Sequence, residues 1–253
     1  MNLDIILKQY KNGEIDLSMA TKEINNFLYI KQGNLVVDTF RSHLVGFPEF
    51  IYGMNKTAEQ LIEIAGVYLE KQLNFICTKI SEEKMKILQK KYPFFEYIPE
   101  ANFVRNIIKP CDKIPGNVSI LTGGLTDIRV AIESYETLKT LAIDVTIYSD
   151  IGIAGIHRLF DQIKDIEKGD VLIVIAGMEG ALPSIIGGLS YKPVIAVPTS
   201  TGYGASLEGF TALFSMLTSC ANGITVVNID NGFGAAIAAF RILNTSNKKT
   251  CKY

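Results

Sequence analysis

The strongest constraint on the fold is a regular alternation of short apolar segments with helix-like segments after residue 116. The apolar segments are NVSIL, DVTIYS, VLIVIA, PVIAVP and ITVVNI, which begin at residues 117, 144, 171, 193 and 224. Helical patterning follows each, over about 128–141, around 157–163, and from about 181, 207 and 235. This rhythm is typical of a parallel sheet with helices on both faces, whose strands are apolar throughout because both faces are buried. The sequence therefore predicts an α/β fold here.

The first part of the chain has a different pattern. Only 5 of the 21 glycines precede residue 111, and KPCDKIPG at 109–116 interrupts regular structure as a linker would. The pattern predicts helices over 2–11 and 16–28, an extended segment over 35–39 and an apolar run over 74–80. Thr57 and Gln60 form a capping-box signature for a helix to about Glu70, and Ser81 caps another helix. We expect a small α+β domain over 1–112 before the α/β domain over 113–253.

Composition restricts the possible functions. A formal net charge of -1 creates no overall field for nucleic acid or an anionic membrane, so the expected partners are small molecules. The longest apolar run, 171–176, is too short to span a bilayer, and the absence of a signal-peptide pattern predicts a cytoplasmic protein. Four cysteines without a CxxC pair and two histidines argue against a structural zinc site and predict free thiols.

Glycine-containing loops follow every predicted strand of the α/β part. They read TGGLTD, SDIGIAG, GMEGALP, TSTGYG and DNGFG. Ligands of such sheets bind beyond the carboxyl ends of the strands, and glycines there let backbone N–H groups approach a phosphate. The loops favour a nucleotide or phosphorylated ligand, with ordinary tight turns as the alternative. No GxxxxGK[ST], GxGxxG or GxSxG motif occurs, which disfavours a P-loop protein, a Rossmann dehydrogenase and a serine hydrolase.

Longer segments carry a family resemblance. GNVSILTGGLTDIRVA, GIAGIHR, AGMEGALPSIIGGL and the stretch from PVIAVPTSTGYG to NGFGAA resemble the LarB family of pyridinium-3,5-biscarboxylic acid mononucleotide synthases. The same half is similar to PurE, the aminoimidazole ribonucleotide mutase, whose motifs are echoed by Thr126-Asp127, His157-Arg158 and Leu182-Pro183. The resemblance implies a PurE-like, flavodoxin-like three-layer parallel sheet after the α+β domain.

Departures from PurE favour LarB. PurE has a histidine before its leucine-proline pair, where this chain has Ala181, and it lacks a counterpart of Cys220. GFPE at 46–49 also looks like the amino-terminal part of LarB, although Leu44 departs from the more basic pattern of that loop. The segment containing GFPE, 40–57, has the composition of a shaped loop, with an ordinary connection as the alternative.

The LarB resemblance implies carboxylation of the pyridinium C5 of nicotinic acid adenine dinucleotide by CO2 or bicarbonate, and hydrolysis of the phosphoanhydride to release AMP. This would begin the synthesis of the nickel-pincer nucleotide cofactor. Mg²⁺ is expected as a cofactor near the diphosphate, where Asp127 and Asp150 are candidate holders, and the full set of ligands is not assigned. The expected catalytic residues are Cys220, Glu179 and His157. The expected substrate-binding residues follow the strands: Gly123, Gly124, Thr126, Asp127, Asp150, Arg158, Gly177, Met178, Pro198, Thr199 and Ser200.

The chemistry explains why a cysteine is needed. A pyridinium ring is electron-poor and cannot attack CO2, whereas thiolate addition at C4 makes C5 enamine-like, and later expulsion of the thiolate restores the ring. Cys220 is expected at the carboxyl end of a helix, whose dipole opposes thiolate formation, so Glu179 is the candidate base. The alternatives are a buried and purely structural Cys220, a solvated Glu179, helix capping by Asp127 or Asp150, and a structural His157.

Two other functions stay open at this stage, a PurE-type mutase and a nucleotide-binding sensor without turnover. A homo-oligomer is expected, with an octamer plausible from the PurE resemblance. The segments TALFSMLTS and AAIAAFRIL are apolar beyond what one sheet face needs, which points to helices that pack between subunits.

Overall fold

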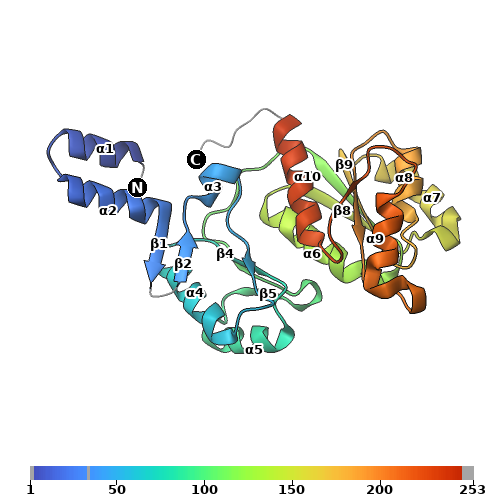
Figure 1. Cartoon of the computed structure of the whole chain (residues 1–253), viewed down its shortest axis with the longest axis horizontal. Helices are drawn as coiled ribbons and strands as arrows, with labels where there is room; N and C mark the ends of the chain where they lie inside the picture. The colour runs from blue at the N-terminus through green and yellow to red at the C-terminus, as the bar shows by residue number, and fades with distance from the viewer. Residues whose placement is uncertain (1–2, 33–34, 247–253) are drawn as a thin grey trace.

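The computed structural model describes residues 3–32 and 35–246. Its amino-terminal region consists of α1 (Leu3–Lys11), α2 (Leu17–Leu28), β1 (Tyr29–Gln32), β2 (Leu35–Asp38), α3 (Arg41–Val45), β3 (Ile51–Tyr52), α4 (Ala58–Glu70), β4 (Phe75–Thr78), α5 (Glu82–Lys91), β5 (Glu96–Ile98), η1 (Pro99–Ala101) and β6 (Phe103–Asn106). Strands β1 and β2 form an antiparallel hairpin, and the four-stranded sheet has the order β3-β4-β6-β5. This is the expected α+β arrangement (Figure 1).

Local signals in this region predicted helix starts accurately. The Thr57 side chain accepts the Gln60 N–H while the Gln60 side chain accepts the Thr57 N–H, which is the predicted capping box. Ser81 likewise caps α5. Residue 2, the first of the predicted helix 2–11, lies outside the described residues. The strands β5 and β6 were not predicted, because both are short. They pair with each other on either side of η1, and β6 also pairs with β4, which is distant in sequence.

The carboxy-terminal region is a five-stranded parallel sheet of order β11-β10-β9-β7-β8. It contains β7 (Asn117–Thr122), η2 (Leu125–Asp127), α6 (Ile128–Thr140), β8 (Asp144–Tyr148), η3 (Ile153–Gly155), α7 (Ile156–Ile166), β9 (Val171–Ala176), α8 (Leu182–Leu189), β10 (Val194–Pro198), η4 (Gly204–Gly209), α9 (Phe210–Leu217), β11 (Thr225–Val226) and α10 (Gly232–Ser246). The predicted PurE-like, flavodoxin-like α/β fold is confirmed.

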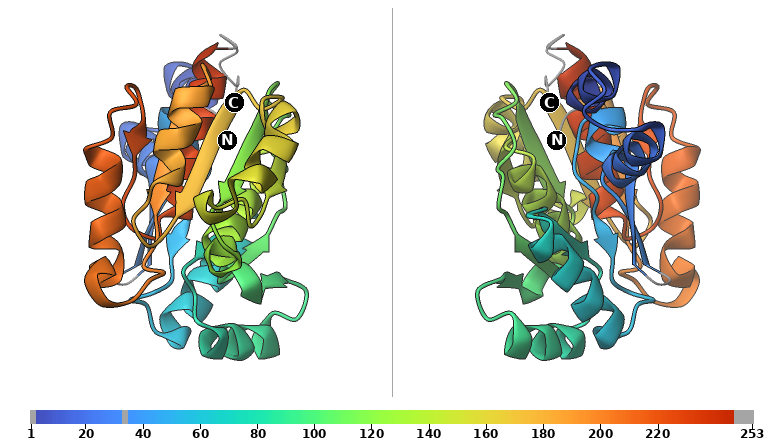
Figure 2. Two further views of the ribbon diagram at one scale, coloured as in Figure 1. Left: turned by 90° about the vertical axis from the view of Figure 1, so that its right-hand side faces the viewer. Right: turned by 90° about the vertical axis from the view of Figure 1, so that its left-hand side faces the viewer.

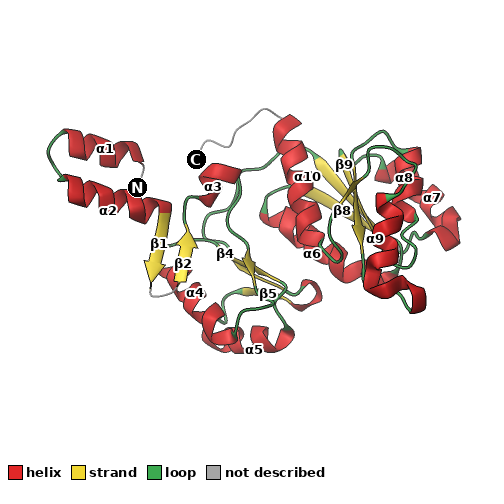
Figure 3. Cartoon of the chain, viewed as in Figure 1, coloured by secondary structure: helices red, strands yellow, loops and turns green. Residues whose placement is uncertain are grey.

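Helices cover both faces of this sheet (Figures 2 and 3), and each face packs against its own apolar cluster. Ile120, Ile173 and Ile195 face α6 and α10, whereas the alternate residues Leu121, Leu172 and Ala196 face α7, α8 and α9. Successive side chains of a strand point to opposite faces, so strands covered on both sides must be apolar throughout. Burial on both faces therefore explains the unbroken runs that the sequence shows.

Three element boundaries differ from the prediction. The helix expected from about Leu207 begins at Phe210, because Leu207 and Glu208 have φ of 46° and 54°, in the left-handed region that ends helical geometry. The last strand is restricted to Thr225–Val226, and α10 begins at Gly232 rather than Ala235.

The amino-terminal region packs against α6 and α10. Phe47 meets Phe240 of α10 at a centroid distance of 5.5 Å, and Phe50 meets Phe233 at 5.0 Å. Arg105 of β6 pairs with Glu136 of α6 at 3.0 Å. Part of the apolar surface of α10 is thus buried within the chain, whereas Ile237, Ala238 and Ile242 are only partly buried, so subunit contacts through this helix stay a prediction.

Helix α9 does retain an exposed apolar face. The side chains of Phe210, Phe214 and Leu217 are among the exposed large hydrophobics.

Among the described helices, none is long and apolar enough to cross a membrane.

Candidate active site at the carboxyl edge of the parallel sheet

The strand order predicts a ligand-binding crevice between the ends of β7 and β9. The chain leaves β7 for its neighbour β8 and then crosses back to β9 on the other side of β7. In doubly wound sheets this change of direction separates the loops after the two strands and opens a ligand-binding crevice at their carboxyl ends. The loops concerned are residues 123–127 and 177–181, both of which the sequence analysis singled out.

Asp127 is a buried carboxylate at this edge with hydrogen bonds to two loops. Its side chain accepts the Thr199 hydroxyl at 2.7 Å on Oδ1 and the Gly124 N–H at 3.0 Å on Oδ2. Both Asp127 and Thr199 are buried, at 3% and 1% exposure. Burial raises the pKa of Asp127, while the hydrogen bonds from Thr199, Gly124 and Thr201 lower it and the nearby Asp230 raises it. Asp127 thus joins the loop after β7 to the end of β10. This contact is additional to the helix-capping role that the sequence left open for it.

The loop after β9 lies directly against the loop after β10. The Met178 N–H donates to the Thr201 oxygen at 2.9 Å, and Met178 has a left-handed φ of 52°. A Cβ on Gly177 would overlap the Thr201 oxygen and lie 2.7 Å from Thr199 Oγ1. Glycine is therefore required at position 177 by the close approach of two loops.

Asp150 and Arg158 form an ion pair at the neighbouring strand end. Arg158 Nη1 donates to Asp150 Oδ2, and both side chains are about two-fifths exposed, at 39% and 42%. The Asp150 N–H donates to Thr122 Oγ1 at 3.2 Å, which fixes this loop to β7. The side chains of His157, Thr126 and Glu179 are exposed and form no hydrogen bond or ion pair with the other described residues. The structure therefore places His157 and Glu179 at the surface without assigning them a partner.

Ser200 and Asp230 continue the edge beyond β10. The Ser200 N–H donates to Asp230 Oδ1 at 2.9 Å, and the Asp230 N–H donates to the Pro198 oxygen at 2.9 Å. Asp230, Thr201 and Lys79, which bonds to the Asp230 oxygen, were missed as site residues. Asp230 was detectable, since it opens the glycine-containing loop DNGFG after the last strand.

Cys220 is not brought to this edge within one chain. Gly209, just before α9, packs on the Thr199 oxygen, whereas Cys220 follows the far end of α9, roughly 12 Å further along the helix axis. Its neighbours Ser219 and Ala221 contact Ser184 and Gly187 of α8. Cys220 is a free and exposed thiol, whereas Cys77 is buried, which raises its pKa to about 12. Cys251 lies outside the described residues.

The edge has few groupings suited to a metal. Within residues 3–32 and 35–246, no group of three or more His, Cys, Asp or Glu side chains could hold a metal ion. Mg²⁺ commonly uses only one or two carboxylates together with substrate phosphates and water. Both oxygens of Asp127 already accept protein donors, so Asp150 and Asp230 are the better-placed carboxylates.

A cavity of about 660 Å³ lies elsewhere, lined by Asp38, His43, Glu49, Tyr68, Cys111 and Phe240 among others. None of the predicted site residues lines it. The strand-end residues are the candidate site, because the sheet topology and their hydrogen bonds both place them where a ligand of this fold binds.

The arrangement of the two regions agrees with known proteins. A family model described as the LarB/PurE-like N-terminal domain matches residues 29–108, and one described as AIR carboxylase matches residues 117–252. An uncharacterized protein of Methanocaldococcus jannaschii is 40% identical over 98% of this chain and 99% of its own length. The N5-carboxyaminoimidazole ribonucleotide mutase of the same organism is 34% identical over 53% of this chain and 83% of its own length. The mutase of Thermotoga maritima is 33% identical over 50% of this chain and 74% of its own length. The chain therefore belongs to the LarB family, in which a PurE-like domain of the carboxylase and mutase type follows a LarB-type amino-terminal domain.

Proposed function

We propose that this protein carboxylates the pyridinium C5 of nicotinic acid adenine dinucleotide and hydrolyses its phosphoanhydride, forming pyridinium-3,5-biscarboxylic acid mononucleotide and AMP. The observation that carries the proposal is the exposed Cys220 thiol in a chain whose LarB-type amino-terminal region precedes a PurE-like sheet. Ala181, where PurE has a histidine, supports the same choice.

The strand-end loops supply the phosphate-binding groups. The loop at Gly123 and Gly124 precedes η2 and α6, where the helix dipole favours an anion, whereas the N–H groups of the two glycines themselves donate to the Ile175 oxygen and to Asp127 Oδ2. Arg158 adds a planar donor set suited to phosphate, and its pairing with Asp150 holds it in place. Mg²⁺ would be held by Asp150 or Asp230 together with the diphosphate, and it would stabilise charge on the leaving AMP phosphate.

Cys220 supplies the nucleophile for carboxylation. Its thiolate adds to ring C4, which neutralises the pyridinium and leaves an electron-rich C5 that attacks the carbon of CO2. Loss of the C5 proton to a base and departure of the thiolate from C4 then restore the aromatic ring with a new carboxylate. Glu179, exposed on the loop after β9, is the proposed base. Solvent exposure lets the thiol reach a substrate without any rearrangement of the core.

The separation of Cys220 from Asp127 supports a homo-oligomeric enzyme. The exposed Phe210, Phe214 and Leu217 give α9 an apolar face suited to contact with a second copy. Such contact would carry the Cys220 of one copy toward the strand-end loops of another. The resemblance to PurE makes an octamer one candidate for this assembly.

Incubation with nicotinic acid adenine dinucleotide, ¹³C-bicarbonate and Mg²⁺ tests the proposal. We expect AMP together with a mononucleotide that carries one additional ¹³C carboxylate, detected by mass spectrometry. The variant Cys220→Ser should form no ¹³C-labelled carboxylate, because a hydroxyl is a weaker nucleophile and a poorer leaving group than a thiol. Unaltered carboxylation by this variant would exclude the covalent mechanism.

A PurE-type mutase is the second candidate, favoured by the 34% identity to the Methanocaldococcus jannaschii mutase. Turnover of carboxyaminoimidazole ribonucleotide and not of the dinucleotide would establish it. Tight nucleotide binding without either product would instead indicate a sensor.

A further inference from the structure

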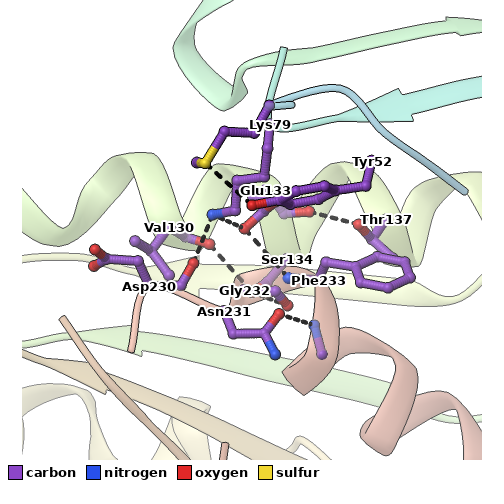
Figure 4. Close-up of polar contacts among 12 residues, drawn as sticks. Tyr52, Lys79, Val130, Glu133, Ser134, Thr137, Asp230, Asn231, Gly232 and Phe233 are labelled. Carbon is purple, nitrogen blue, oxygen red and sulfur yellow. Dashed lines mark hydrogen bonds and ion pairs between the residues drawn. The ribbon is translucent and has the colours of Figure 1, made fainter. Parts of the chain in front are cut away.

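A lysine of the amino-terminal region reaches the loop at the end of the parallel sheet. Lys79 follows β4, and its Nζ lies 2.6 Å from the backbone oxygen of Asp230 and 2.9 Å from Glu133 Oε2 in α6. Figure 4 shows the lysine directed from the amino-terminal sheet to α6 and to the loop before α10. One ammonium group therefore connects segments that are 151 positions apart in the sequence.

The loop that Lys79 contacts also shapes the candidate site. The Asp230 N–H donates to the Pro198 oxygen, and Asp230 Oδ1 accepts the Ser200 N–H. Both Lys79 and Asp230 have a φ of 55°, in the left-handed region that non-glycine residues seldom occupy. Such conformations persist where surrounding contacts over-determine them, and they gather at functional sites.

Glu133 explains why a cation is required at this point. Its side chain is only 2% exposed, Oε2 also accepts the Phe233 N–H at 3.3 Å, and Oε1 has no hydrogen-bond partner among the described residues. A Cβ on Gly232 would lie 3.0 Å from Glu133 Oε2, so the loop is pressed against α6. Removing one member of a buried ion pair leaves an uncompensated charge, which is strongly unfavourable.

We propose that Lys79 is a positioning residue, through which the amino-terminal region holds the Asp230 loop and the Ser200 amide in the arrangement that receives substrate. The kinetic test of Lys79 uses the dinucleotide as substrate and therefore rests on the proposed function. The effect of Lys79 on the Asp230 loop does not rest on it, because it is measured in the free protein.

Four variants separate positioning from simple charge compensation. Lys79→Met removes the ammonium group, and Lys79→Arg replaces it with another cation. Lys79→Met combined with Glu133→Gln removes both charges. Lys84→Met is the matched control. Like Lys79, Lys84 donates to backbone oxygen, but its two acceptors, Gly53 at 3.0 Å and Met54 at 2.7 Å, both lie within the amino-terminal region.

Amide hydrogen exchange of the free protein and steady-state kinetics provide the readouts. In Lys79→Met we expect exchange around residues 198–200 and 228–233 to accelerate about 10- to 100-fold, as loss of a charged hydrogen bond predicts. KM for the dinucleotide should rise by a similar factor with a smaller change in kcat. Lys79→Arg should stay near wild type, and Lys84→Met should change neither readout.

The double variant decides between the two explanations. We expect it to recover much of the thermal stability lost in Lys79→Met without recovering KM or the slow exchange. Recovery of all three, or wild-type exchange and KM in Lys79→Met, would overturn the proposal. If the wild-type protein does not turn over the dinucleotide, the proposed function fails, and the exchange comparison alone still decides the role of Lys79.

Discussion

The hydrogen bond between Thr199 and Asp127 offers a quantitative test of the candidate site. Replacing Thr199 by valine keeps the shape of the side chain and removes the hydroxyl that donates to Asp127 Oδ1 at 2.7 Å. Both residues are almost fully buried, so water cannot replace the lost donor. A hydrogen bond to a charged group contributes about 1.5–3 kcal/mol. For a protein of this size the loss should lower Tm by about 3–12 °C at neutral pH.

The penalty should also depend on pH. Burial raises the pKa of Asp127, so its contribution to stability is fully present below its unfolded value and declines as the pH rises through its folded value. The Thr199 hydrogen bond lowers that pKa and limits the decline. In Thr199→Val the folded pKa should therefore rise further, and the destabilisation should be larger at pH 7 than at pH 4.

Thermal unfolding at pH 4 and pH 7, at one protein concentration, measures this effect. Thr137→Val is a matched control, because the Thr137 hydroxyl is equally buried but donates to a neutral backbone oxygen, that of Glu133, at 2.8 Å. Its penalty should be about 1 kcal/mol and independent of pH. Equal penalties for the two variants at both pH values would refute the assignment of a charged Asp127 acceptor. A double-mutant cycle with Asp127→Asn should show a coupling of about 1 kcal/mol or more.

Three further predictions follow from single side chains. Cys220→Ala should abolish carboxylation but change the free energy of unfolding by less than about 0.5 kcal/mol, because the thiol is exposed. Product analysis and urea titration measure the two effects, and a folded variant with full activity would show that the sulfur is dispensable. Gly177→Ala should destabilise the protein by about 2 kcal/mol or more, since the added Cβ overlaps the Thr201 oxygen, and an unchanged Tm would contradict the loop geometry. Phe214→Ser on α9 should weaken self-association in light scattering, and an unchanged assembly would place the subunit contact elsewhere.

Much of the fold could be predicted from local sequence patterns. Strand positions follow from apolar runs such as 171–176, because a strand covered on both faces has no solvent-facing side. The starts of α4 and α5 follow from Thr57 and Ser81, because a helix cap involves residues only three positions apart. The glycine-containing loops indicated which edge of the sheet would hold the candidate site, since strand direction and connection rules place them together.

Only the tertiary structure decided which side chains meet. Asp127 and Thr199 are 72 positions apart, and Lys79 and Asp230 are 151 apart, so no local pattern records either contact. The sequence pattern also favoured a buried Cys220, and this was wrong: the structure exposes the thiol beyond the end of α9, because nothing in the sequence records which face of that junction is covered. The physical reason is that periodicity and capping report on neighbours along one element, whereas strand order and the packing of the amino-terminal region on α6 and α10 bring distant elements together.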